Sequence, residues 1–384
     1  MHDIEYPAFA FDSDLTREII AFERARANLS RGTTPSIIYS QLKELFQLLT
    51  SIMSARIEGN RTSILDAVTG AAESRLGNSL RPQNEGVREI LNIQRAITFI
   101  DANVGSSPVD HLFIRELHRI VVDGLSREGD HTPGAYRLGE VSIGHSAHHP
   151  PWPSDVPDYM SVLVAFIAQP QAPHNQLLQT AIVHHRFLWI HPFGNGNGRV
   201  ARLITYAMLI QHGFSSSAGY GAVNPTAVFG ADRQAYYDNL ELADTLENDG
   251  VVAWCTYVLR GLNSDLANLA RLSDAEFVIH QVLVPAVERL RAAGGLTLRE
   301  AEALSIAAAQ TTVKAADLES AFPGSASSRS HAIKRLIDRG LLVPVESGAR
   351  SYRLAFVPND LTVHLVRRLD MADLLPTILK DHEL

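Results

Sequence analysis

HPFGNGNGRVAR, residues 191–202, is the most informative stretch of this chain. It places a histidine, three glycines and two arginines close together. Glycines let the backbone approach a ligand closely, and the helix predicted over 199–211 offers free N–H groups and a positive dipole end to an anion. His191 has an ordinary pKa near neutrality, which suits a general base. These residues predict a phosphate-binding loop with a base beside it.

Two arginines support this interpretation. Arg199 and Arg202 stand three positions apart, so a helix puts both on one face, where they can bind phosphate oxygens together. The alternative is a glycine-rich turn between two helices, with a structural histidine. The glycines alone do not decide between the two, whereas base, glycines and arginines in one run favour the binding loop.

The composition is that of an ordinary globular protein, 46% hydrophobic and 20% charged. A net charge of −8 argues against a chain that coats nucleic acid along its whole length. The single cysteine, Cys255, excludes an internal disulfide framework and fits a reducing compartment. No apolar run reaches bilayer length and the first residues do not resemble a secretory signal, so we expect a cytoplasmic protein with no membrane partner.

Helical periodicity dominates from about residue 36 to residue 290, so the fold class is expected to be mainly α. The apolar spacing predicts helices over 36–57, 83–102, 109–123, 156–168, 174–190, 199–211, 231–246 and 250–260. Between 131 and 155 the pattern breaks at Thr132-Pro133-Gly134, and Val141-Ser142-Ile143 follows, which predicts a short β-hairpin.

Beyond about residue 292 the pattern changes. It predicts helices over 297–309, 313–321 and 327–339, then strands over 341–345 and 350–356, which is the order of a winged helix-turn-helix. Residues 329–353 carry six basic side chains against two acidic ones: Arg329, Lys334, Arg335, Arg339, Arg350 and Arg353 against Asp338 and Glu346. Residues 325–353 could therefore face DNA, and a protein-interaction module with a solvated basic face is an equally weighted alternative.

The central stretch resembles the signature of the Fic family, H-P-F-x-[D/E]-G-N-G-R-x-x-R, with one departure at Asn195, where the family has a carboxylate. The resemblance extends over about 35–265 and implies a helical Fic core in which the predicted hairpin is a flap over the nucleotide site. Flap residues Val141, Ser142, Ile143 and Gly144, together with Tyr236 and Tyr237, resemble the residues that line that site. Asp244 stands where the family often has an asparagine.

A second motif lies earlier in the chain. Residues Ser54-Ala55-Arg56-Ile57-Glu58-Gly59 resemble the family's inhibitory signature, [S/T]-x-x-x-E-[G/N]. The resemblance implies that Glu58 pairs with Arg202 and keeps ATP in an unproductive pose, because a carboxylate and a phosphate compete for one bidentate donor. The alternative is an ordinary solvated acid at a helix end. We expect loss of an exposed ion pair of this kind to change stability by only ~0–1 kcal/mol.

The resemblance also implies a reaction, the transfer of AMP from ATP to a Ser, Thr or Tyr hydroxyl of a protein. His191 would deprotonate the hydroxyl, and backbone N–H groups of Gly196 to Gly198 would stabilise charge, with Asn197 shaping the loop. Arg199 and Arg202 would hold the leaving pyrophosphate. Mg²⁺ would bridge the phosphates, with Asn195 as a weak protein ligand, since an amide offers an oxygen but no charge.

These inferences divide the chain into 1–105, an N-terminal helical region with the inhibitory helix; 106–262, a Fic catalytic core; 263–295, a connecting helix; and 296–384, a winged-helix-like domain with a helical tail. We expect a nucleotidyltransferase that acts on a protein target. A nucleotide-responsive transcriptional regulator with a weak or inactive Fic site is the alternative. A homodimer is left open by the sequence.

Overall fold

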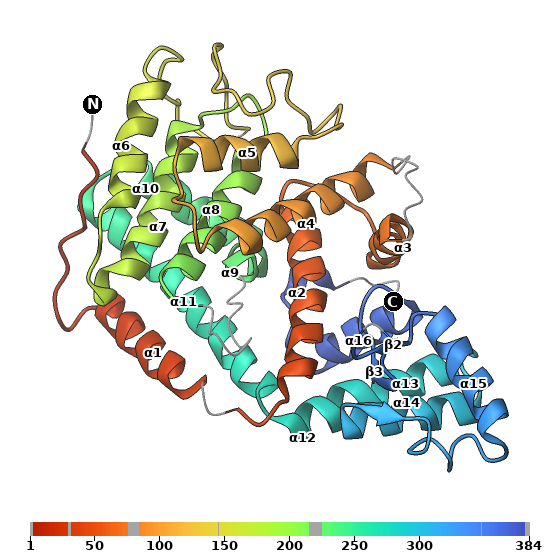
Figure 1. The fold of residues 1–384 in the computed structure, drawn as a ribbon. Helices are drawn as coiled ribbons and strands as arrows, with labels where there is room; N and C mark the ends of the chain where they lie inside the picture. Colours follow the sequence, from red (N-terminus) through yellow and green to blue (C-terminus); the bar gives the residue numbers. More distant parts are fainter. Residues whose placement is uncertain are drawn as a thin grey trace.

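The computed structural model describes residues 3–29, 32–75, 84–144, 146–214, 225–346 and 348–380. The larger part is a bundle of helices around a buried apolar core (Figure 1). Its helices are α1 (Asp14–Leu29), α2 (Ser36–Ile57), α3 (Ile64–Arg75), α4 (Glu85–Asn103), α5 (His111–Val121), α6 (Val156–Ala168), α7 (Pro173–Ile190), α8 (Asn197–Gln211), α9 (Pro225–Ala231), α10 (Arg233–Ala243) and α11 (Asn248–Leu272).

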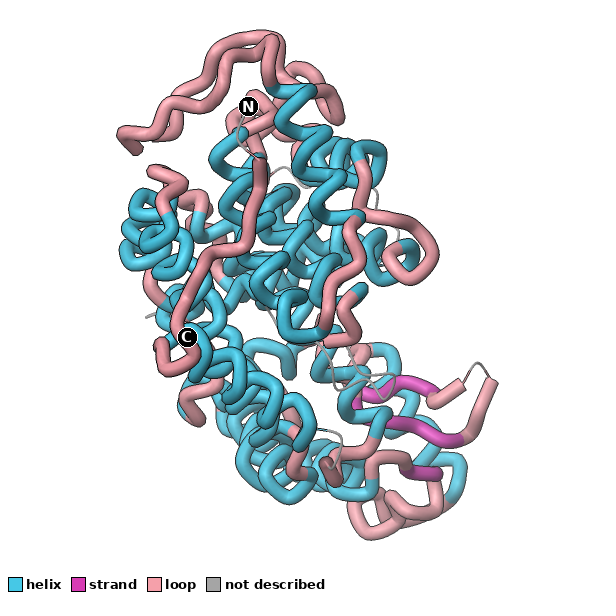
Figure 2. Tube along the Cα trace, turned by 90° about the vertical axis from the view of Figure 1, so that its left-hand side faces the viewer, coloured by secondary structure: helices cyan, strands magenta, loops and turns pink. Residues whose placement is uncertain are grey.

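The C-terminal part combines helices with a small antiparallel sheet of strand order β1-β3-β2 (Figure 2). Its elements are α12 (Ala275–Phe277), the π-helix η1 (Val278–Leu283), α13 (Val284–Ala292), α14 (Leu298–Gln310), β1 (Val313–Lys314), α15 (Ala326–Asp338), β2 (Leu342–Pro344), β3 (Ser351–Leu354), α16 (Asp360–Met371) and the 3₁₀ turn η2 (Thr377–Leu379). The mainly α fold class is confirmed.

Helix α2 is the element that the two parts share. It packs against α4, α8 and α9 in the larger part and against η2 in the C-terminal part (Figure 1). Its apolar residues fall on more than one face, and Leu45, Met53, Ala55 and Ile57 are all at most 1% exposed. Near its start, Gln41 accepts a hydrogen bond from the backbone N–H of Phe356 (3.2 Å). A helix that is apolar on several faces has to be buried on several faces.

The predicted hairpin over 131–155 is wrong as regular structure. Residues 131–144 and 146–155 form a long loop without strands, and His145 lies outside the described residues. The backbone explains the difference, because its hydrogen bonds leave the segment. The N–H of Arg137 donates to the carbonyl of Pro192 (2.8 Å), and that of Gly134 donates to Nδ1 of His118 (2.9 Å). The loop is therefore held by the 191–202 stretch and by α5, and no partner strand is required.

The helix predicted over 313–321 is also wrong. Helix α14 ends at Gln310, and Thr311 takes a positive φ of 68°. The β-branched run Thr311-Thr312-Val313 favours an extended backbone, and Val313 pairs with Tyr352 in β3. Turns occupy 315–320, so the C-terminal part has the order helix, strand, turn, helix, hairpin.

The basic residues of 325–353 do not share one exposed face. Arg329 is buried and donates to Glu319 (3.0 Å), and Arg339 donates to Asp360 (3.0 Å). Lys334, Arg335 and Arg350 are exposed. The positive surface is therefore smaller than the sequence count indicates, because two of its guanidinium groups have acidic partners within the fold.

Core packing along α2 predicts a clear contrast between two leucines. Leu45 is fully buried in α2, whereas Leu65 in α3 is 57% exposed. Leu45→Ala should lower the free energy of unfolding by about 2–5 kcal/mol, because it removes buried methyl groups and leaves a cavity. Leu65→Ala should stay within about 0.5 kcal/mol of the parent. Urea unfolding followed by circular dichroism measures both, and equal losses would contradict the burial of α2.

Candidate active site

The stretch 191–202 forms a tight loop between α7 and α8. Helix α7 ends at Ile190, and the next residue, His191, adopts a left-handed backbone with φ 51°. Phe193 is fully buried, and Asn197 locks it in place: the Phe193 N–H donates to Asn197 Oδ1 (3.0 Å), and Asn197 Nδ2 donates to the Phe193 carbonyl (2.9 Å). Gly196 follows with φ 77°, a conformation that costs glycine little, and α8 begins at the next residue. The N-terminus of α8 therefore faces the space beside His191.

His191 is held as a neutral base. Its Nδ1 lies 3.2 Å from the carbonyl oxygen of Leu188. A carbonyl only accepts, so we assign the proton to Nδ1, which leaves the lone pair on Nε2. Burial lowers the pKa of His191 to about 4, with a further lowering by Arg137, while the bond to Leu188 and the charge of Glu58 oppose it.

A second histidine and an aspartate support the loop from behind. His118 is fully buried and stacks on Phe193, with ring centroids 3.7 Å apart, and its Nε2 lies 3.1 Å from the carbonyl of Asn195. Asp130 accepts from the N–H of Asn195 (3.1 Å). Burial lowers the pKa of His118 to about 4, although Asp130 opposes this. No residue pattern marks either role, apart from the presence of a histidine in an otherwise amphipathic helix.

The two arginines have separate partners. Arg202 is buried, and its Nε donates to Ser54 Oγ (2.9 Å) while its Nη2 donates to the Ser54 carbonyl (3.0 Å) and to Glu58 Oε1 (2.7 Å). Arg199 is equally buried and lies 3.1 Å from Glu89 Oε1 on α4. The pairing of Glu58 with Arg202 that the resemblance implies is therefore present, and Ser54 lies behind the arginine.

Arg199 carries further contacts that sequence reasoning missed. Its Nη2 donates to the carbonyl of Glu128 (2.9 Å) and lies 3.6 Å from the Glu128 carboxylate. Burial raises the pKa of Glu89, and Arg199 opposes that shift. Glu89 and Glu128 come from distant parts of the chain, and no motif marks them.

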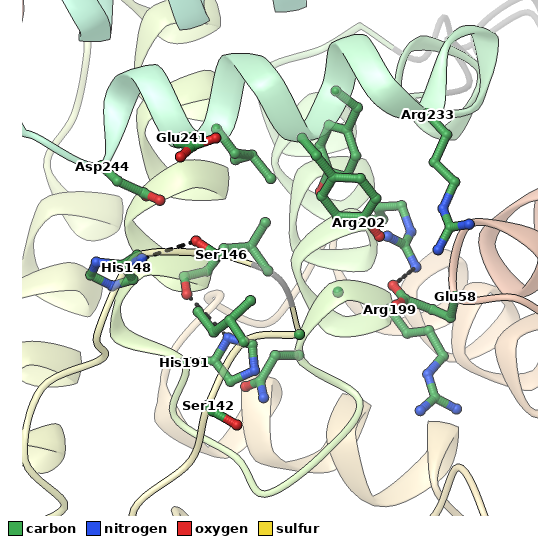
Figure 3. Close-up of a pocket in the computed structure, with 18 of the residues that line it drawn as sticks. Glu58, Ser142, Ser146, His148, His191, Arg199, Arg202, Arg233, Glu241 and Asp244 are labelled. Carbon is green, nitrogen blue, oxygen red and sulfur yellow. Dashed lines mark hydrogen bonds and ion pairs between the residues drawn. The ribbon is translucent and has the colours of Figure 1, made fainter.

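The carboxylate of Glu58 lies directly over the start of α8 (Figure 3). A Cβ atom added to Gly198 would collide with it. Burial would raise the pKa of Glu58, but Arg202, with Arg199 and Arg233, lowers it overall. The side chains of Arg202 and Glu58 are 1% and 27% exposed, so the expectation of an exposed, weak ion pair is wrong. Removal of one partner leaves a buried charge to be satisfied, which costs more than a surface pair contributes.

The loop, Glu58 and α10 enclose a cavity of about 770 Å³ (Figure 3). The predicted residues that line it are Ser142, Ile143, Gly144, His191, Asn195, Gly196, Asn197, Gly198, Arg199, Arg202, Tyr236, Tyr237 and Glu58. Val141 and Ser54 are not among its lining residues. The lining residues that the prediction did not include are Ser146, His148, Leu188, Gly194, Arg233, Gln234, Asp238, Leu240, Glu241 and Asp244.

The two tyrosines differ in their surroundings. Tyr236 is 1% exposed, and its hydroxyl lies 2.9 Å from Nε2 of the buried His184. Tyr237 is 38% exposed, and the Arg233 guanidinium lies over its ring at 5.5 Å. At the other end of the cavity, Asp244 Oδ1 lies 3.0 Å from Nε2 of His185. The cavity therefore has a cationic end at α8 and an acidic end at the close of α10 (Figure 3).

Asn195 uses its side-chain oxygen within the loop. Oδ1 accepts from the N–H of Gly196 (2.6 Å) and lies 3.4 Å from Arg199 Nη2. The structure shows no group of three or more metal-ligating side chains that could hold a metal ion among the residues it describes. One engaged amide oxygen does not match the carboxylate ligands that Mg²⁺ prefers, so the residues present do not form a magnesium site by themselves.

Residues 108–209 match the model of the Fic/DOC family. The chain contains a Fic/DOC domain. Curated relatives named protein adenylyltransferase Fic are similar to this chain in sequence. The relative from Aedes aegypti is 29% identical over 199 residues, which are 50% of this chain and 36% of the relative. That of Drosophila virilis is 29% identical over 237 residues, or 59% and 44% of the two chains. The chain thus spans less than half the length of these relatives.

Solved structures share the Fic fold. A Fic family protein from Desulfovibrio desulfuricans G20 superposes with a TM-score of 0.55 at 18% identity, covering 91% of this chain and 98% of the other. Fic-1 from C. elegans, residues 134–508, gives a TM-score of 0.53 at 18% identity, covering 66% and 71%. The first alignment includes most of the C-terminal part. In the described part of the chain, no helix is long and apolar enough to cross a membrane.

The environment of His191 predicts an unusual titration. Its pKa of about 4 lies below the ordinary value, so between about 4 and 6.5 the unfolded chain binds a proton that the folded chain does not. The free energy of unfolding should therefore fall as the pH is lowered through that window. NMR of ¹⁵N-labelled histidine should show a neutral ring with the proton on Nδ1 at pH 6, assigned by its loss in His191→Gln. An apparent pKa near 6.5 would contradict the burial of the ring.

Proposed function

We propose that this chain is a protein adenylyltransferase that moves AMP from ATP to a Ser, Thr or Tyr hydroxyl of a protein and is inhibited by its own Glu58. One observation carries the proposal: a neutral histidine and a helix N-terminus share a cavity in which Glu58 occupies the buried arginine at 2.7 Å. The Fic/DOC domain and the names of the relatives support the class of reaction. Glu58 and the hydroxyl target are the finer parts of the proposal.

The base is suited to activation of a hydroxyl. Nε2 of His191 has a free lone pair that can take the proton as the hydroxyl oxygen attacks the α-phosphorus of ATP. The new phosphorus–oxygen bond replaces the bond to the β-phosphate, and pyrophosphate leaves. The low pKa of His191 keeps the ring unprotonated at neutral pH, so the base is available without a preceding deprotonation.

The cationic end of the cavity is suited to the phosphates. Backbone N–H groups at the start of α8 and the positive end of its dipole stabilise negative charge. Arg202 can add a bidentate contact only when Glu58 releases it, since Glu58 already takes Nη2. Arg199 is held by Glu89, so it supplies less free positive charge than its position in the sequence indicates.

The proposal predicts that Glu58→Gly raises AMP transfer. Removal of the carboxylate frees Arg202 for a phosphate, and couplings of this kind change an equilibrium by on the order of 5- to 150-fold. ATP labelled at the α-phosphate, followed by gel analysis of the protein itself and of added proteins, measures the transfer. The variant should also lose some stability, because Arg202 then keeps only its contacts to Ser54.

The matched control is the double variant Glu58→Gly with His191→Ala, which should bind ATP and transfer nothing. Label that moves from the γ-phosphate but not from the α-phosphate would identify a kinase and overturn the proposal. If Glu58→Gly binds ATP tightly and transfers no AMP, the alternative function, a nucleotide-responsive regulator, is favoured. The residue that favours this alternative is Asn195, because its amide carries no negative charge with which to bind a metal ion.

Asn195 gives a second prediction. Asn195→Asp keeps the oxygen that accepts from Gly196 and adds a charged one of nearly the same size. Hard cations prefer carboxylates, so Mg²⁺ should strengthen the binding of ATP more in this variant than in the parent. Titration calorimetry with and without Mg²⁺, in the Glu58→Gly background, measures this. Weaker binding in the presence of Mg²⁺ would mean that the new charge repels the triphosphate and that Asn195 suits a metal-free pose.

A further inference from the structure

The last turn of α2 is tied to the C-terminal end of the described chain. Arg56 stands two residues before Glu58, and its Nη1 donates to the carbonyl of Ile378 in η2 (2.9 Å). Its Nη2 donates to the carbonyl of Thr62 (3.1 Å), in the loop that follows Glu58. The Arg56 guanidinium therefore connects η2 with the loop after Glu58, while the backbone of Arg56 belongs to the helical turn before Glu58.

The chain around η2 is anchored by two leucines before the turn and one within it. Leu374, Leu375 and Leu379 are buried at 3%, 8% and 1% exposure. On α9, a Cβ atom added to Gly230 would lie 3.0 Å from Cγ2 of Ile378 and within 4 Å of Met53 and Ile57 of α2. The absence of a side chain at Gly230 leaves the space in which Ile378 reaches the end of α2. Turn η2 packs against α2 and α9, and the preceding helix α16 packs against α3.

The opposite side of the inhibitory turn faces the cavity. Gly59 takes φ 98°, and Asn60 Nδ2 donates to Glu89 Oε2 (2.8 Å), the carboxylate group that also pairs with Arg199. Glu58 binds Arg202 on the same side. The turn is thus held between two sets of contacts: α4 and α8 toward the cavity, and η2 through Arg56 on the other side.

We propose that Arg56 is a positioning residue for Glu58, and that η2 sets through it how strongly Glu58 occupies Arg202. The proposal rests on the autoinhibition proposed above. Helix α16 leads into η2, and the C-terminal sheet leads into α16, so a ligand that displaces this part of the chain draws Ile378 away from α2. Release of Arg56 then loosens the last turn of α2, and Arg202 becomes available to the nucleotide.

The test uses the full chain and changes each side of the contact. Arg56→Gln removes the guanidinium, and Ile378→Ala removes the side chain that packs between α9 and α2. Arg61→Gln is the control, because it makes the same charge change at an exposed position of the loop that follows Glu58. Hydrogen exchange of the last turn of α2, ATP affinity by calorimetry and AMP transfer are measured for each, alone and combined with Glu58→Gly.

Arg56→Gln and Ile378→Ala should each speed exchange in the last turn of α2, and should each raise ATP affinity and transfer on the order of tenfold, as residues that modulate coupling do. Neither should add to the effect of Glu58→Gly, and Arg61→Gln should resemble the parent. Unchanged exchange would overturn the role of η2. An equal gain in the Glu58→Gly background would overturn the route through Glu58.

The proposed function and this inference fail in different ways. If no variant transfers AMP, including Glu58→Gly, the proposed transfer reaction is wrong, while exchange and ATP affinity still decide whether Arg56 acts through Glu58. A lower melting temperature for Arg56→Gln with unchanged exchange and affinity would make Arg56 a purely structural residue and overturn the proposal.

Discussion

Two buried guanidinium groups on one helix constrain the whole site. Arg199 and Arg202 are at most 2% exposed, and an ionised side chain cannot be buried without partners at an acceptable cost. Their acceptors come from three separate segments: the end of α2, helix α4 and the loop that contains Glu128. Because both arginines of α8 need hydrogen-bond acceptors, segments that share no local sequence pattern meet around this helix. The cavity is the space that remains between these segments.

Most of the helices and the central loop could be predicted because residues close together in the sequence determine them. The apolar spacing of 36–57 and 156–168 corresponds to helices with the same limits, because those segments bury one or more continuous apolar faces. The loop of 191–202 could be inferred because base, glycines and arginines are adjacent in sequence. The pairing of Glu58 with Arg202 needed a family resemblance, since nothing in the composition of α2 indicates which distant cation its end will meet.

Long-range contacts account for what could not be predicted. His118, Asp130 and Glu89 act on the loop only through the folded chain, and each looks like an ordinary residue of its own segment. The segment 131–155 was predicted as a hairpin because Thr132-Pro133-Gly134 indicates a turn and Val141-Ser142-Ile143 a strand, but its backbone forms hydrogen bonds to Pro192 and His118. The sequence count includes Arg329 as a surface charge, but this side chain is buried and pairs with Glu319.

Gly198 has a consequence for how this protein can change. The volume that a side chain at position 198 would need is filled by the Glu58 carboxylate, so even an alanine at 198 and this carboxylate cannot both keep their places. Two positions that are remote in the chain are thereby linked: a side chain at 198 would displace the glutamate, whereas loss of the glutamate would leave Arg202 Nη1, 3.2 Å from a Cβ atom at 198, as the remaining close neighbour. The contact between Glu58 and Arg202 can therefore be lost by substitution at either of two codons, and it persists only while both are kept.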